Sequence, residues 1–140
     1  KIQELLIQEK NTVTLERFCT ETDSRPNTPV QLTAMPNPNG YDALILGAPV
    51  QAFSLDPAMS AYLARIGEIK PVPTLCFITQ YFKKPWLGGN HAMKQLLALL
   101  REKGVSAEAG GIINWSSEKR EEQIKLLAQR CADALKENRV

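Results

Sequence analysis

Apolar residues recur at helical spacing in the middle of the chain. Within residues 59–66 they stand at positions i, i+3, i+4 and i+7, which places their side chains on one face of a helix. Asp56 can accept hydrogen bonds from the first helical amides, and Pro57 suits the first helical position, where no backbone donor is needed. Gly67 ends the pattern. The sequence therefore predicts an amphipathic helix that begins at Asp56-Pro57 and ends at Gly67.

Three further segments carry the same apolar periodicity. The chain opens on residues 2–9, and Asn11 can close that helix. A second pattern runs from about Asn90 to Lys103-Gly104, and a third runs from Ser116 or Ser117 to Leu135, with acidic residues in its first turn. Acidic side chains are favoured there by the helix dipole. We expect amphipathic helices in all three places.

Short apolar runs lie between these helical patterns. The runs at 41–47 and 73–79 are continuous and bounded by turn residues, as is typical of strands buried on both faces of a parallel sheet. Another strand is expected within 106–114. Residues 12–19 alternate apolar and polar side chains and are rich in β-branched residues, which predicts a strand with one more exposed face.

The order of these elements indicates the fold class. Apolar strands that alternate with long amphipathic helices predict an α/β fold with a doubly wound parallel sheet, right-handed crossovers and helices on both faces. A length of 140 residues with 44% hydrophobic residues fits a single domain over residues 1–140. Residues 20–40 are rich in Pro, Asn, Thr and Ser and are expected to form a long surface loop.

Ligands of open α/β sheets bind in loops beyond the carboxyl ends of the strands. The expected loops at 48–54 and 80–89 are therefore the candidate site. Their aromatic residues can form flat walls, and the pair Gly88-Gly89 with Asn90 can let backbone amides approach a ligand closely. The alternative is that the loop aromatics cover the edge of the sheet or an oligomer interface. The aromatic residues are Phe53, Tyr81, Phe82 and Trp86.

Two long stretches carry a resemblance to a known family. YDALILGAPVQAFSLDPAMSAYLARIG resembles the third strand, flavin-facing loop and following helix of flavodoxin-like proteins. CFITQYFKKPWLGGNHAMKQLLALLREKGVSAEAGGI resembles the next strand, the second flavin-facing loop, a helix and a strand. The resemblance implies the strand order 2-1-3-4-5, with residues 12–19 as the second strand. The resemblance implies that the first strand and the phosphate-binding loop lie before Lys1, outside the sequence as given, or that the strand comes from elsewhere, for example by exchange between subunits.

The resemblance also implies a cofactor, FMN, and the residues that face it. Ala48 stands where the family often has Ser or Thr, and Gln51 stands where it often has an aromatic residue, so stacking from the first loop would fall to Phe53. FMN binding by these residues alone is expected to be weak. The implied cofactor-binding residues are Ala48, Pro49, Val50, Gln51, Ala52, Phe53, Thr79, Gln80, Tyr81, Phe82, Trp86, Gly88, Gly89 and Asn90.

Two classes of function follow. The first is an FMN-binding redox protein, either a small NAD(P)H-dependent reductase of quinones or similar acceptors, or an electron carrier with a redox partner protein. The second is a degenerate flavodoxin-like module that has lost the flavin and serves as an interaction or oligomerisation domain, for example in a homodimer. The sequence carries no motif of a protein nucleophile or metal site, so no catalytic side chain is predicted and any redox chemistry would belong to the cofactor.

Composition narrows the partners and the compartment. Seventeen Lys and Arg against fifteen Asp and Glu give a net charge of +2 without a basic cluster, so nucleic acid is not an implied partner. The longest apolar stretches are far shorter than the roughly 20 residues of a membrane span. Three widely spaced cysteines form no CxxC motif. We expect them to be small buried hydrophobes in a reducing cytoplasm.

Overall fold

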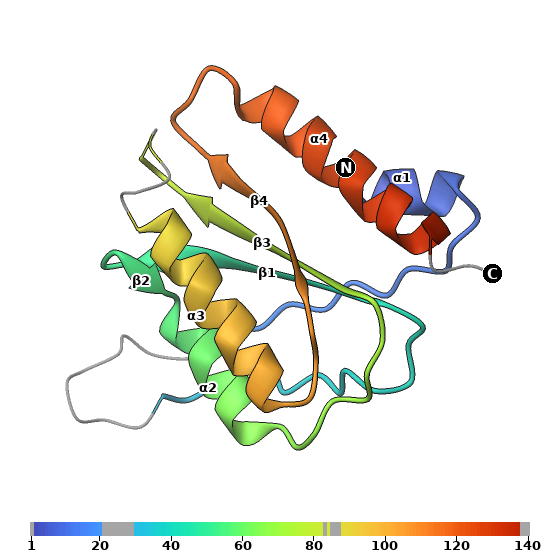
Figure 1. The fold of residues 1–140 in the computed structure, drawn as a ribbon. Helices are drawn as coiled ribbons and strands as arrows, with labels where there is room; N and C mark the ends of the chain where they lie inside the picture. The colour runs from blue at the N-terminus through green and yellow to red at the C-terminus, as the bar shows by residue number, and fades with distance from the viewer. Residues whose placement is uncertain (1, 21–29, 83, 85–87, 138–140) are drawn as a thin grey trace.

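A four-stranded, mostly parallel sheet forms the centre of the computed structural model, which describes residues 2–20, 30–82, 84 and 88–137 (Figure 1). The strand order is β2-β1-β3-β4; β1, β3 and β4 run parallel and β2 is antiparallel to β1. The α/β prediction is confirmed at this level. The elements are α1 (Ile2–Gln8), β1 (Leu44–Gln51), β2 (Ser54–Leu55), α2 (Pro57–Arg65), β3 (Thr74–Gln80), α3 (Gly89–Glu102), β4 (Glu108–Asn114) and α4 (Arg120–Glu137).

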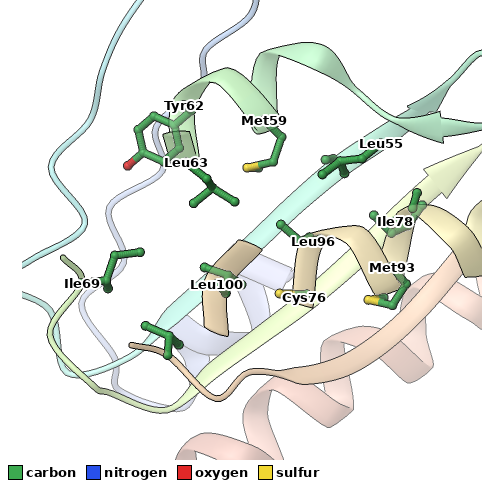
Figure 2. Close-up of a cluster of buried hydrophobic side chains, with 13 residues drawn as sticks. Leu55, Met59, Tyr62, Leu63, Ile69, Cys76, Ile78, Met93, Leu96 and Leu100 are labelled. Carbon is green, nitrogen blue, oxygen red and sulfur yellow. The ribbon is translucent and has the colours of Figure 1, made fainter. Parts of the chain in front are cut away.

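Helices cover both faces of the sheet. Figure 1 shows α2 and α3 on one face and α4, with α1 beside it, on the other. Successive side chains of a strand point to opposite faces, so Cys76 and Ile78 of β3 join the cluster under α2 and α3, whereas Leu75 and Phe77 join the cluster under α4. Figure 2 shows the larger cluster, in which Leu96 and Leu100 of α3 lie against β3.

Local capping signals explain the helices. The carboxylate of Asp56 accepts a hydrogen bond from the Ala58 amide at 3.2 Å, and Pro57 is the first residue of α2. This helix ends at Arg65, two residues before the Gly67 of the prediction. At the start of α4, the Ser117 hydroxyl accepts from the Lys119 amide at 3.1 Å. The predicted helices are confirmed, with ends displaced by a few residues.

Strand β1 differs from its prediction at Gly47. The pattern placed the start of a loop there, but β1 continues through Gly47 to Gln51 and pairs with β3 as far as Pro49. A Cβ at Gly47 would overlap the ring of Phe77 on β3. The glycine therefore serves the close approach of an aromatic ring within the sheet. The prediction of a loop from Ala48 onward is wrong.

Residues 12–19 do not form the predicted strand. Over this part of the described chain the only pairing is an isolated bridge between Thr20 and Leu32. The Leu15 side chain is 57% exposed, while the ring of Phe18 packs against that of Tyr62 with centroids 4.4 Å apart. An alternating pattern forms a strand only where a neighbouring strand supplies hydrogen bonds. The segment is therefore not the second strand of a 2-1-3-4-5 order in the described chain.

Two of the three cysteines are buried, and the third is exposed. Cys76 and Cys131 lie in the two cores, and burial raises their thiol pKa from 9.0 to about 12 and about 11. Cys19 is exposed on the extended segment before the Thr20–Leu32 bridge. The expectation of three buried cysteines is therefore wrong for Cys19, because the strand that would have contained it does not form.

Candidate functional site

A hollow of about 340 Å³ lies where the parallel strands end. It is at the carboxyl edge of the sheet, where ligands of open α/β sheets bind, and its size is at the lower end of the range for small-molecule sites. Five of its lining residues belong to the predicted site, and Trp115 does not. The lining residues are Pro49, Val50, Thr79, Gln80, Tyr81 and Trp115.

Four aromatic residues stand exposed around this edge, and we call Phe53, Tyr81, Phe82 and Trp115 the edge aromatics. Their exposed fractions are 58%, 71%, 43% and 52%. The rings of Phe53 and Phe82 are nearly parallel, at 4° with centroids 5.8 Å apart, and Tyr81 meets Phe82 edge-on. Large exposed rings at one edge offer apolar area to a ligand or a partner protein.

Phe53 reaches this edge through a strained hairpin. β1 and β2 are joined by Ala52 and Phe53 alone, with φ of 51° and 62°. Two-residue hairpins of this type require left-handed backbone at both central positions, which is why Asn-Gly and Gly-Gly usually occupy them. A non-glycine residue there costs about 1–2 kcal/mol. The aromatic side chain of Phe53 is therefore held at the hairpin tip by a backbone conformation that is unfavourable for a non-glycine residue.

Gly88 and Gly89 bring the start of α3 against the hairpin and β3. Gly88 has a φ of 108°, and a Cβ there would lie 2.9 Å from both Phe53 Cα and Val50 Cγ1. A Cβ at Gly89 would lie 2.7 Å from the Gln80 Oε1. Both glycines are buried. The prediction was that these glycines let backbone amides approach a ligand closely. In the structure they let the start of α3 approach the hairpin and β3 closely.

A buried polar network lies beneath the two loops. Gln80 and Asn114 are each 4% exposed, and Gln80 Nε2 donates to Asn114 Oδ1 at 2.5 Å. The same Nε2 donates to the carbonyls of Lys84 at 2.6 Å and Phe82 at 3.3 Å. The Trp115 amide donates to the Gln80 carbonyl at 2.7 Å. The loop after β3 and the end of β4 are therefore joined by side-chain and backbone hydrogen bonds.

Other predicted site residues lie away from the hollow. Ala48 is buried under α2 and α3, Gln51 is exposed and pairs with Ser54, and Asn90 is exposed on the first turn of α3. Ala52 occupies the hairpin tip beside Phe53. Trp86 lies outside the described residues. The structure thus brings together part of the predicted set, at the ends of β1 and β3.

Trp115 was not predicted, although it directly follows the last expected strand. The rule that pointed to the ends of β1 and β3 applies equally to the end of β4. The guanidinium of Arg120 lies 4.7 Å from the centroid of its ring, and Arg120 Nη1 donates to the Trp115 carbonyl at 3.2 Å. These contacts fix the indole beside the hollow, with a cation near its ring.

Two searches of the described residues gave no site. Within residues 2–20, 30–82, 84 and 88–137, His, Cys, Asp and Glu side chains form no group of three that could hold a metal ion. No described helix combines the length and apolar character needed to cross a membrane.

No family model matches the chain, and no curated protein matches its sequence. The flavodoxin-like assignment stays a prediction.

Proposed function

We propose that the chain is an FMN-binding redox protein and that the isoalloxazine ring lies in the hollow at the carboxyl edge. The observation that carries this proposal is the hollow itself, with Tyr81 and Trp115 in its lining and Phe53 and Phe82 stacked nearby. An isoalloxazine is flat and apolar on its faces, and one edge is a row of hydrogen-bond donors and acceptors. It needs aromatic or aliphatic walls and a few backbone groups.

The residues present fit the ring part of FMN. Pro49 and Val50 contribute aliphatic residues to the lining at the end of β1, and Tyr81 and Trp115 contribute aromatic ones. We assign no described residue to the FMN phosphate. When bound, FMN supplies electron transfer, and the protein residues bind the ring, orient it and shield the faces that they cover.

Within the redox class, a reductase is favoured over a carrier. The net charge of +2 and the mixed distribution of charges do not provide the strongly acidic face through which a carrier would dock to a basic partner. The reductase would take electrons from NAD(P)H and pass them to a quinone or a similar small acceptor, in the cytoplasm.

An FMN titration of the purified protein tests the proposal. We expect saturable quenching of flavin fluorescence, with a dissociation constant in the micromolar range or above, about −8 kcal/mol or weaker. Riboflavin, which lacks the phosphate, is the matched ligand, and it should bind nearly as well because the proposed contacts are to the ring. A protein that quenches neither flavin at any concentration would rule out the redox function.

The exposure of the edge aromatics also supports the second candidate, an interaction or oligomerisation module. Tyr, Trp and Phe are enriched in protein interfaces, and all four of these rings are more than two-fifths exposed. Sedimentation velocity over a range of protein concentrations separates the candidates. Self-association without flavin uptake, lost in Phe82→Ser, supports the module; a monomer that binds flavin supports the redox protein.

A further inference from the structure

Gln80 has an unusual position for a glutamine. It is the last residue of β3, its side chain is 4% exposed, and its neighbours Cys76 and Ile78 on the same face belong to the core under α3. Glutamine is seldom buried without a polar role. Here its Nε2 carries two N–H groups and lies within hydrogen-bond distance of three oxygens, those of Phe82, Lys84 and Asn114, so one N–H is shared between two acceptors.

The orientation of the Gln80 amide follows from these partners. Two of the three oxygens are backbone carbonyls, which can only accept, so exchanging the amide oxygen and nitrogen would place acceptors against acceptors. The remaining atom, Oε1, is buried and has no hydrogen-bond partner among the described residues. It lies against Gly89, where a Cβ would be 2.7 Å away.

An unpartnered buried oxygen destabilises the folded state. A leucine or methionine would fill the same space without a buried polar atom. The hydrogen bonds that Nε2 donates are therefore the property that distinguishes glutamine from these residues at this position. What they hold is the described part of the loop after β3, which is Tyr81, Phe82 and Lys84 and is bonded through the carbonyls of Phe82 and Lys84. The loop is also tied to the end of β4, because the Ser116 amide donates to the Tyr81 carbonyl at 3.1 Å.

We propose that Gln80 is a positioning residue of the carboxyl-edge site: its amide group holds the loop after β3 against β4, and so places Tyr81 and Phe82 beside the hollow. Gln80 was predicted to contact the cofactor, and it lines the hollow; the role proposed here acts through the loop and is separate from such a contact. The inference rests on the proposed function only where it names flavin as the ligand whose binding depends on the loop.

The variant Gln80→Glu tests this role because it keeps the shape of the side chain and removes both amide donors. The matched control is Gln95→Glu on α3, where Oε1 accepts from the Leu55 amide at 2.8 Å and a carboxylate can accept equally. Amide hydrogen exchange at Trp115 and Ser116 reports the loop directly, since these amides donate to the carbonyls of Gln80 and Tyr81.

In Gln80→Glu at pH 8 we expect exchange at the Ser116 amide to rise about tenfold or more, and the FMN dissociation constant to rise about tenfold, as for loss of a buried hydrogen bond. Exchange of α3 amides such as Ala92 should stay within about twofold. Below the pKa of the introduced carboxyl its O–H can donate again, so the difference from wild type should shrink at lower pH. Gln95→Glu should leave the Ser116 amide and FMN affinity unchanged.

The outcomes are distinguishable. Unchanged exchange at Ser116, or an equal rise at every amide, would overturn the positioning role; so would a loosened loop with unchanged FMN affinity. If wild type binds no FMN while the Ser116 amide still loosens selectively, the loop-holding role stands and the proposed function fails. If Gln80→Glu does not fold, Gln80→Met, which lacks donors and carries no charge, should show the same selective loosening.

Discussion

The core under α3 and the carboxyl edge of the sheet are built from the same strands in opposite ways. In the core, Leu63, Ile78 and Leu96 are fully buried apolar side chains. At the edge, a few residues further along β1 and β3, the hairpin is strained, four large rings are exposed, and Gln80 Oε1 has no hydrogen-bond partner among the described residues. The first arrangement stabilises the fold, whereas the hairpin strain and the buried amide oxygen of the second lower its stability. Strain and unpartnered polar groups of this kind cluster at functional sites.

The largest expected contrast concerns thiol reactivity. Cys76 in the core is fully buried, which raises its pKa from 9.0 to about 12, while Cys19 is exposed. A thiol-reactive disulfide reagent at pH 8 should modify Cys19 rapidly and Cys76 at least about 1000-fold more slowly, because reaction there requires opening of the native state. Absorbance of the released thiolate measures both phases. Comparable rates would show that the core is open.

The same pKa gives a pH dependence of stability. Folding keeps the Cys76 thiol protonated to higher pH than in the unfolded chain, so its contribution is complete below pH 9 and is lost as the pH rises toward 12. The free energy of unfolding should therefore fall over this range, less steeply in Cys76→Ala. An identical slope in the variant would exclude Cys76 as the cause.

Removal of core volume should have the next largest effect. Leu96→Ala truncates a side chain with no exposure in the centre of the larger cluster and should lower the free energy of unfolding by about 2–5 kcal/mol. Leu126→Ala, on the outer face of α4 and 53% exposed, should change it by less than about 0.5 kcal/mol. Urea denaturation measures both. Equal losses would contradict the placement of the core.

A substitution at Gly88, where the start of α3 approaches the hairpin, should lower the free energy of unfolding less than a truncation in the core. Gly88→Ala adds a Cβ at a φ of 108° and 2.9 Å from Phe53 Cα, so a loss of about 1–3 kcal/mol is expected. Gly67→Ala is the control, because no atom of the described residues lies within 4 Å of its Cβ position; it should change stability by less than about 1 kcal/mol. If both variants matched wild type, α3 would not lie against the hairpin as described.

The smallest effect on stability, with a larger effect on binding, is expected at the edge. Phe53→Ala removes one ring of the Phe53–Phe82 pair and should cost about 0.5–1.5 kcal/mol, but weaken FMN binding about tenfold. Leu15→Ala removes an equally exposed side chain, at 57% against 58%, outside the site. Flavin titration should separate the two variants. Equal affinities would remove Phe53 from the site.

Features that depend on neighbouring residues in sequence were predictable. The capping residue Asp56 and the following Pro57 predict the start of α2, and the spacing of apolar residues predicts the helices. The carboxyl-edge rule, applied to the ends of two strands, found Pro49, Val50 and Tyr81 in the hollow lining.

Features that depend on a distant partner were not predictable. The sequence pattern predicts the start of a loop at Gly47, whereas in the structure this glycine makes room for the ring of Phe77. The alternation in residues 12–19 predicts a strand, but the described residues contain no strand that pairs with them. Ala52-Phe53 carries no sequence signal of a two-residue hairpin. Trp115 is a different case. The rule that ligands bind beyond the carboxyl ends of parallel strands would have found it, had the rule also been applied to the end of β4.

The central claim is that the carboxyl edge binds flavin while the core serves stability, and NMR of the ¹⁵N-labelled protein during FMN addition tests it most directly. We predict progressive shifts of the Val50 and Tyr81 amides and the Trp115 indole, with the Leu96 amide unmoved. Shifts confined to a different hollow, the one lined by residues 35–39 and 66–68, or no shifts at all, would contradict the account.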